Sequence, residues 1–310
     1  MRVLLLLALS LTPALAQKAD RIGRIEFFGY SGVDIKKLKS GLPVKEGQEF
    51  RMAKPGDLAK LTIRTKEVVQ RIAKRPVTDF APVCCDSEGN WTIYIGLSGK
   101  ASIYRPVPKG EVRLPAELIA LYDQFMKALE QSIRRGATGE DRSKGYALSV
   151  DPEMRKVQLD MREAALKNEA LLLDVLANCP DGQQRVVAAE IMGYAQQSRQ
   201  QIAALADAAR DPDTTVRNNA TRALGVLVQS NPRLSKEIPA EIFVELLLSG
   251  EWTDLNKAAM LLASITGEGA DEKMLALLRR SDVRDRLSEM SRWPKGHCET
   301  AQHLLKISSD

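Results

Sequence analysis

The residue types best suited to chemistry gather near the C-terminus of this sequence. His297, Cys298 and Glu299 are consecutive and His303 follows, so imidazole, thiol and carboxylate groups lie close together. Such side chains bind zinc, but a structural zinc site uses four ligands in closely spaced pairs, and a second pair is missing. The two histidines are six residues apart, which puts them on different faces of a helix. A metal-binding or enzymatic protein that uses this cluster is therefore the alternative interpretation.

Catalytic arrangements of other kinds are not indicated. His297 and His303 are the only histidines among 310 residues, so a serine or cysteine elsewhere in the sequence lacks a neighbouring imidazole base. The glycine-rich residues 134–145 lack the Gly-Lys-Ser/Thr ending of a phosphate-binding loop. We therefore expect no catalytic residue, no cofactor and no metal ion, and we interpret the protein as non-catalytic.

The composition is that of an ordinary folded protein with two differently charged parts. Apolar residues make up 44% and charged residues 27%, which argues against wholesale disorder, and 310 residues suggest about two domains. Residues 17–110 carry 18 basic and 10 acidic side chains, whereas residues 111–310 carry 26 and 30. A structural protein whose basic part touches an anionic lipid surface is therefore a further alternative.

Residues 1–16 have the pattern of a secretory signal peptide. A positive start at Arg2 precedes an apolar run, and Ala14-Leu15-Ala16 is a cleavage motif of small residues. The apolar run is shorter than the roughly 20 residues that a membrane-spanning helix needs, and no cysteine follows it as in a lipoprotein. We expect cleavage after Ala16, a bacterial periplasmic or secreted location, and no transmembrane segment in the mature chain.

Four cysteines follow the predicted signal peptide: Cys84, Cys85, Cys179 and Cys298. An exported protein is able to form disulfides, and four cysteines allow three complete pairings, among which the sequence does not select. A bond between the adjacent Cys84 and Cys85 would strain the chain. Buried thiols are the other open interpretation.

Residues 17–98 predict a small α+β domain with the order β-α-α-β-β. Apolar and polar residues alternate in the predicted strands, and apolar residues recur at helical spacing between them. The turn Asp86–Asn90 predicts that the last two strands form a hairpin. The predicted elements are a strand at 22–29, helices at 34–42 and 57–74, and strands at 77–85 and 91–97.

This pattern resembles the polypeptide-transport-associated (POTRA) family over about residues 20–98. The opening residues 24–29 (Arg-Ile-Glu-Phe-Phe-Gly), the second helix from Asp57 and the hairpin around Glu88-Gly89-Asn90 carry the resemblance. Domains of that family lie in the periplasm and bind other chains, often by adding a strand to a sheet edge. The resemblance therefore implies a polypeptide partner at an exposed strand edge.

The strand that begins at Val77 is the candidate edge. Pro76 and Pro82 suit an edge position but interrupt continuous strand pairing. The alternative is a small α+β domain that only packs on the rest of the chain. The residues assigned to the possible strand-pairing edge are Val77, Thr78, Asp79, Phe80 and Val83.

Residues 99–152 are expected to connect the two parts. Pro106, Pro108 and Gly110 predict a linker over residues 99–112. Apolar residues at helical spacing predict an amphipathic helix over residues 114–135, and residues 136–152, rich in glycine and charge, predict a mobile loop.

Residues 153–310 predict an all-α solenoid built from a repeat. A shift of 32 residues places Asp181 on Asp213, Arg185 on Arg217 and Gly193 on Gly225. A fixed period of this size is typical of repeat proteins. Small residues at matched places are expected to let neighbouring helices approach.

The segment 211–225 is similar to the HEAT-repeat family, and the resemblance covers about residues 163–290. It implies that Asp181 and Asp213 begin helices and that Arg185 and Arg217 link neighbouring repeats. Aspartate at a helix start accepts hydrogen bonds from free N–H groups, which favours this structural role over an acid–cation site. Arrays of this family bind other proteins and rarely carry chemistry.

The sequence thus predicts a signal peptide at 1–16, a POTRA-like domain at 17–98, a connection at 99–152 and a HEAT-like helical domain at 153–310. We interpret the protein as an exported scaffold or adaptor of the bacterial envelope. The expected partners are proteins of the cell envelope rather than nucleic acid.

Overall fold

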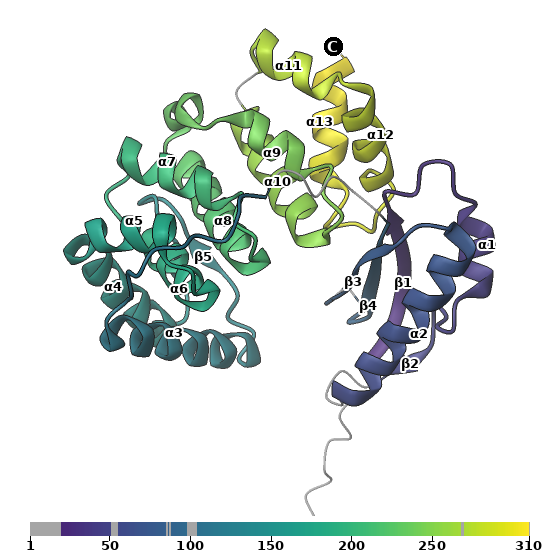
Figure 1. Ribbon diagram of the computed structural model, residues 1–310, viewed down its shortest axis with the longest axis horizontal. Helices are drawn as coiled ribbons and strands as arrows, with labels where there is room; N and C mark the ends of the chain where they lie inside the picture. The colour runs from purple at the N-terminus through teal and green to yellow at the C-terminus, as the bar shows by residue number, and fades with distance from the viewer. Residues whose placement is uncertain are drawn as a thin grey trace, which may run out of the picture.

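The computed structural model describes residues 20–50, 55–84, 86, 88–97, 104–267 and 270–309. The chain has two parts: an N-terminal mixed α/β region with a small sheet, and a largely helical C-terminal region (Figure 1). The predicted signal peptide and Cys85 lie outside the described residues.

The N-terminal sheet has four strands in the order β2-β1-β4-β3. β1 lies parallel to β4, while β3 and β4 form an antiparallel hairpin. The predicted order β-α-α-β-β is present, with the two-residue strand β2 in addition, which is too short to show an alternating pattern. The elements are β1 (Asp20–Phe28), α1 (Ile35–Gly41), β2 (Glu49–Phe50), α2 (Pro55–Ala73), β3 (Val77–Val83) and β4 (Trp91–Leu97).

The central strand β4 is buried on both faces of the sheet. Ile93, Ile95 and Leu97 of β4 share a core with residues of α1 and α2, which lie on the side of the sheet away from the helical part (Figure 1). Tyr94 on the opposite face belongs to the core of the helical part. The alternating pattern of β4 predicts one apolar face; the other face is buried as well, because the helical array covers it.

The helical part stacks pairs of helices one on another. Within this array, the second helices of successive pairs pack together, α6 against α8 and α8 against α10. The first helices of the last two pairs, α7 and α9, form the opposite layer of the array (Figure 1). None of the described helices is long and apolar enough to cross a membrane. The helices are α3 (Ala116–Arg134), α4 (Pro152–Lys167), α5 (Glu169–Asn178), α6 (Gly182–Met192), α7 (Arg199–Ala208), α8 (Thr214–Ser230), η1 (Pro232–Glu237), α9 (Ala240–Leu246), α10 (Trp252–Ile265), α11 (Glu272–Leu278), α12 (Ser281–Met290) and α13 (Glu299–Ser309).

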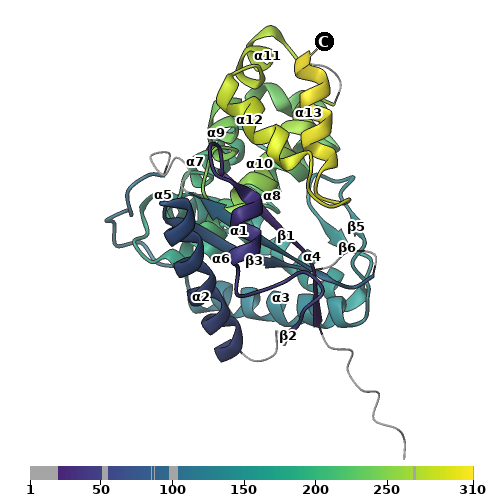
Figure 2. The same ribbon diagram turned by 90° about the vertical axis from the view of Figure 1, so that its right-hand side faces the viewer.

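The sheet is joined to the end of this array. Figure 2, in which the N-terminal part faces the viewer, shows α12 and α13 beyond the end of β1, and α12 contacts that strand. The Glu289 carboxylate of α12 accepts hydrogen bonds from the backbone N–H groups of Gly29 (2.8 Å) and Tyr30 (3.3 Å). A buried charge therefore ties the end of β1 to the helical array.

The described part of the predicted linker, residues 104–112, lies along the turns between the paired helices. The Arg105 N–H donates to the Arg210 carbonyl (2.7 Å), and the Gly110 N–H donates to the Asn178 carbonyl (2.8 Å). A Cβ at Gly110 would lie 2.7 Å from that carbonyl oxygen, so glycine permits the close approach. This segment, which we call the strap, is thus an ordered part of the array.

Residues 136–152, predicted as a loop, contain a two-stranded hairpin. β5 (Glu140–Asp141) pairs with β6 (Leu148–Ser149). Ala147 and Leu148 are buried, and the Lys144 carbonyl accepts a hydrogen bond from the Gln197 side chain (2.5 Å). The apolar pair Ala147-Leu148 holds this segment against the array, although its glycines and charges suggest a free loop.

The described cysteines include both states that the sequence left open, a disulfide-bonded cysteine and buried free thiols. Cys84 is disulfide-bonded. Cys179 and Cys298 are free thiols and are buried.

Candidate interaction face of the helical array

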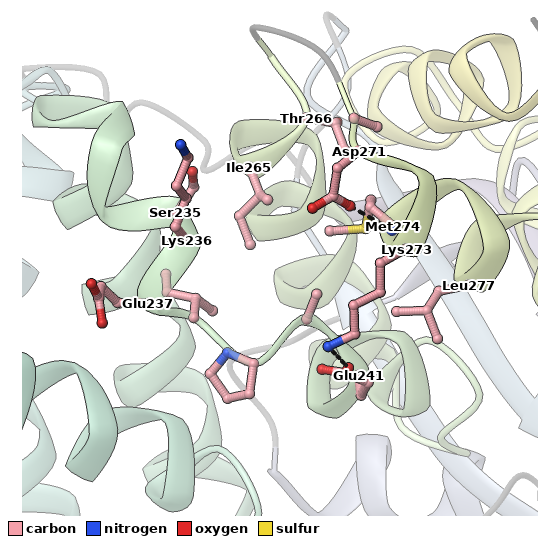
Figure 3. Close-up of a pocket in the computed structure, with 14 residues that line it drawn as sticks. Ser235, Lys236, Glu237, Glu241, Ile265, Thr266, Asp271, Lys273, Met274 and Leu277 are labelled. Carbon is pink, nitrogen blue, oxygen red and sulfur yellow. Dashed lines mark hydrogen bonds and ion pairs between the residues drawn. The ribbon is translucent and has the colours of Figure 1, made fainter.

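A groove of about 460 Å³ lies between η1, α9, the end of α10 and α11 (Figure 3). Two of its charged groups pair with each other, since Lys273 Nζ lies 2.6 Å from Glu241, and Asp271 accepts a hydrogen bond from the Met274 N–H (2.8 Å). The described residues that line it include no histidine and no cysteine. These described lining residues therefore supply hydroxyl, ammonium and carboxylate groups but no imidazole or thiol.

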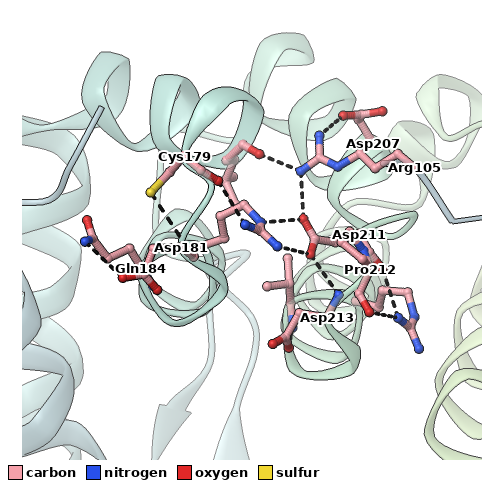
Figure 4. Close-up of polar contacts among 12 residues, drawn as sticks. Arg105, Cys179, Asp181, Gln184, Asp207, Asp211, Pro212 and Asp213 are labelled. Carbon is pink, nitrogen blue, oxygen red and sulfur yellow. Dashed lines mark hydrogen bonds and ion pairs between the residues drawn. The ribbon is translucent and has the colours of Figure 1, made fainter. Parts of the chain in front are cut away.

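Buried arginine–aspartate pairs link neighbouring helix pairs at their turns (Figure 4). Arg185 of α6 donates through Nε and Nη2 to the Asp211 carboxylate, both at 2.8 Å, and through Nη1 to the Cys179 carbonyl (2.9 Å). One helix pair later, Arg217 of α8 donates to the Asp211 carbonyl and to the Asp254 carboxylate, both at 2.9 Å. Each arginine thus joins the turn of its own pair to the next pair.

The two aspartates that the repeat pattern singled out cap helices. Asp181 accepts a hydrogen bond from the Gln183 N–H (2.9 Å) at the start of α6, and Asp213 accepts one from the Thr215 N–H (2.8 Å) at the start of α8. The ion-pair partner of Arg185 is Asp211, which the sequence analysis did not select. Asp213 and Arg217, the pair weighed as an acid–cation site, have separate partners, because Asp213 caps α8 and Arg217 pairs with Asp254.

The strap completes these polar links. Arg105 Nη2 donates to the Asp211 carboxylate (2.9 Å), so two arginines share one buried aspartate. The neighbouring Tyr104 donates its hydroxyl hydrogen bond to Asp254 (2.7 Å), and its ring centroid lies 4.0 Å from the Arg217 guanidinium carbon. Sequence reasoning missed both strap residues, because an arginine between a tyrosine and a proline shows no local sign of a distant carboxylate.

We call the set of buried ion pairs among Arg105, Arg185, Arg217, Asp211 and Asp254 the ladder. Burial acts to raise the pKa of Asp211, but hydrogen bonds from Arg185 and Arg105 outweigh it, so the pKa lies below its ordinary value. The carboxylate stays ionised and is fully occupied by its partners. The ladder therefore holds the helix pairs in register and is not a ligand site.

A second set of charges lies where the β5–β6 hairpin meets α8. One Glu140 carboxylate oxygen accepts hydrogen bonds from Arg142 (2.8 and 3.0 Å), and the other contacts Arg222 of α8. Arg142 also donates to the Gln229 side chain (3.0 Å). These contacts fix the hairpin beside the exposed side of α8 and leave Lys257 of α10 next to them.

The two matched glycines of the repeat differ in their surroundings. A Cβ at Gly193 would lie 3.2 Å from the Ala223 Cβ, so this glycine does allow two helices to approach. A Cβ at Gly225 would meet no atom within 4 Å. Gly225 lines the cavity beside Lys257 instead, so close helix packing does not explain a glycine at this position of the repeat.

The C-terminal histidine and cysteine cluster does not assemble as a metal site. His297 Nδ1 is hydrogen-bonded to the Tyr94 hydroxyl (2.5 Å), and burial lowers the pKa of this imidazole. Cys298 is buried, Glu299 accepts a hydrogen bond from the Gly296 N–H (2.8 Å), and His303 is exposed. No group of three potential ligands of these types occurs among the described residues. His297 instead belongs to the contact between sheet and array.

That contact is an aromatic cluster. The Tyr94 ring of β4 lies 4.7 Å from the Trp293 ring and 5.3 Å from the Trp252 ring, centroid to centroid. Close backbone packing accompanies it, since a Cβ at Gly96 would lie only 2.5 Å from the Gly250 carbonyl oxygen. The sheet and the array therefore share one continuous apolar contact.

The predicted strand-pairing residues lie on β3, which is at the outer edge of the sheet as expected. The Thr78 hydroxyl donates to the Gly250 carbonyl (2.6 Å), and the Asp79 carboxylate accepts from the Trp252 N–H (2.8 Å). Phe80 packs toward the core of the sheet domain, whereas Val83 packs against the core of the array. In the described residues, the β3 backbone forms no hydrogen bond beyond the sheet.

Comparisons with known proteins identify the helical repeat. The family described as HEAT repeats matches residues 169–263, from the start of α5 almost to the end of α10. A solved structure titled as an engineered protein of the Northeast Structural Genomics Consortium is 20% identical, with a TM-score of 0.39; the match covers 52% of this chain and 75% of that one. A search of curated proteins finds no match.

The HEAT-repeat prediction is therefore confirmed, over a narrower range than the predicted residues 163–290. No family match covers the POTRA-like residues 20–98, so that resemblance stays a prediction. Repeats of the HEAT class imply protein binding.

Proposed function

We propose that this protein is an exported, non-catalytic scaffold that binds a polypeptide in the bacterial envelope. The HEAT-repeat array at residues 169–263 is the observation that carries the proposal, because stacked repeats of this kind present extended surfaces to other proteins. Export rests on the signal-like residues 1–16.

The partner binds to the exposed side of α8 and α10. On α6 every residue from Arg185 to Met192 is buried, and α3 and α4 contact this helix. The open part of the array therefore begins at α8. The side chains of Arg222, Gln229, Lys257, Met260 and Ser264 line it, and we call this set the inner strip.

The N-terminal domain supplies the second contact. Its topology, with β1 parallel to β4 and β3 at the edge, supports the POTRA-like assignment and a strand-adding role for β3. Thr78 and Asp79 bond to the turn that precedes α10, so the edge lies beside the helix that carries Met260. One polypeptide is thus able to contact both surfaces.

Site-specific photo-crosslinking tests this proposal. A photoreactive amino acid replaces Met260, which is 39% exposed on the inner strip, or Leu159, which is 47% exposed on α4. In the native envelope the Met260 probe is expected to capture a defined protein in stoichiometric amount, and the Leu159 probe is not. Equal labelling from both positions, or no protein captured from Met260, would contradict the proposal.

Export is tested separately on the full-length chain. The exported protein is expected to begin at Gln17 when its N-terminus is sequenced after cell fractionation. Recovery of the uncleaved chain in the cytoplasm would refute this part of the proposal without affecting the binding surface.

A further inference from the structure

The inner strip contains a cationic cavity between α8, α10 and the β5–β6 hairpin. Arg142, Arg222 and Lys257 line it, together with the apolar side chains of Met260 and Leu261. Its volume is about 50 Å³. A pocket for a cofactor or metabolite usually measures about 300–1,000 Å³, so this cavity fits only the end of a side chain.

The charges in this cavity are not balanced. The Glu140 carboxylate contacts two of the three cations, with one oxygen bound to Arg142 and the other to Arg222. Glu190 lies in the adjoining cavity, also beside Arg222, where burial raises its pKa and so favours the neutral acid. Even with both carboxylates ionised, three cations face two anions.

Lys257 carries the unmatched charge. Among the described residues, no acceptor forms a hydrogen bond or ion pair with its ammonium group, although the side chain is half-buried. Burial lowers the pKa of Lys257, and the positive charges of Arg222 and Arg142 lower it further. A partly desolvated cation held beside two other cations is unfavourable until an anion joins it.

We propose that this cavity binds a carboxylate, the side chain of a glutamate or aspartate on the polypeptide partner, with Lys257 as its principal hydrogen-bond donor. The inference rests on the proposed polypeptide-binding function and specifies its chemistry. Met260 and Leu261 cover the aliphatic stem of the inserted side chain, and the three donors surround its oxygens. The inserted carboxylate replaces water around Lys257 and neutralises the surplus charge.

Methyl NMR on the mature full chain tests the proposal. Met260 reports on the cavity through its 13C-labelled methyl group, which the Met260→Leu variant assigns. The probes are the blocked peptides acetyl-Ala-Glu-Ala-amide and acetyl-Ala-Gln-Ala-amide, with inorganic phosphate as a third arm. The glutamate peptide is expected to shift the Met260 signal saturably, and the glutamine peptide, which has the same shape without charge, is not.

The variant Lys257→Gln keeps a polar side chain and removes the charge. It is expected to weaken binding of the glutamate peptide about tenfold, a typical effect of losing one charge-assisted hydrogen bond. The matched control Lys127→Gln alters an exposed lysine of α3 and is expected to leave binding unchanged. Unshifted signals of the other methionines establish that both variants are folded.

Three results would overturn the inference. They are equal binding of both peptides, undiminished binding by Lys257→Gln, and saturable binding of phosphate without binding of the glutamate peptide. Crosslinking at Met260 separates this inference from the proposed function. If the Met260 probe captures a partner with equal yield with and without Lys257→Gln, the scaffold is supported and only the carboxylate site is removed.

Discussion

The strongest test of the structural reasoning is removal of the Asp211 carboxylate. Asp211 is fully buried and accepts two hydrogen bonds from Arg185 and one from Arg105, besides one from the Asp213 N–H (2.9 Å). The variant Asp211→Ala leaves Arg185, which is 2% exposed, buried without the carboxylate that accepts two of its hydrogen bonds. Breaking a buried ion pair from one side costs about 3–5 kcal/mol.

Urea unfolding followed by far-ultraviolet circular dichroism measures this loss. With a slope of about 3 kcal/mol per molar urea, the midpoint of the helical transition is expected to fall by about 1–1.7 M. The control Asp181→Ala removes an aspartate of the same repeat that only caps α6, which costs about 1 kcal/mol and shifts the midpoint by about 0.3 M. Equal midpoints for the two variants would refute the idea that the ladder holds the helix pairs together.

Three further predictions concern the strap and the contact between sheet and array. Arg105→Ala removes a strap contact with Asp211, and trypsin is expected to cleave faster after the exposed Lys109; an unchanged rate would mean that the strap is held elsewhere. Gly96→Ala places a Cβ against the Gly250 carbonyl and is expected to lower the free energy of unfolding by about 1–3 kcal/mol in the same urea titration. Gly225→Ala has open space around the new Cβ and is expected to raise the free energy of unfolding by up to about 1 kcal/mol. Burial lowers the pKa of His297 below its ordinary 6.5, so below that pH the unfolded chain binds the proton more readily than the folded chain. The free energy of unfolding is therefore expected to fall as the pH drops through 6.5, and to fall less in His297→Gln. Parallel pH curves for the two proteins would show that His297 does not contribute.

The local elements follow closely from the sequence. The strand predicted at 91–97 is β4, and the helix predicted at 114–135 is α3, which spans Ala116–Arg134. The caps at Asp181 and Asp213 were also readable, because a cap uses atoms within three residues of the side chain. Periodicity and capping are properties of neighbouring residues, so a single sequence contains them.

The candidate binding surface was harder to predict from the sequence. Lys257 lies on a helix whose pattern predicts only which side is apolar, and its two cationic neighbours come from α8 and from the hairpin. Arg142 is 115 positions from Lys257 in the numbering of the chain, and it stands there because the buried Ala147-Leu148 pair and Glu140 dock the hairpin on α8. No local pattern of residues signals that three cations from three elements share one cavity.

The sequence by itself determined where helices and strands form, where helices begin, and that the second half is a repeat. Tertiary structure alone decided that Asp211 binds both Arg185 and Arg105, that Tyr94 is buried against Trp252 and Trp293, and that the strap lies along the turns of the array. The physical reason is distance along the chain. Helical periodicity and caps arise from residues a few positions apart, whereas the partner of a buried charge or ring is set by how complete elements stack.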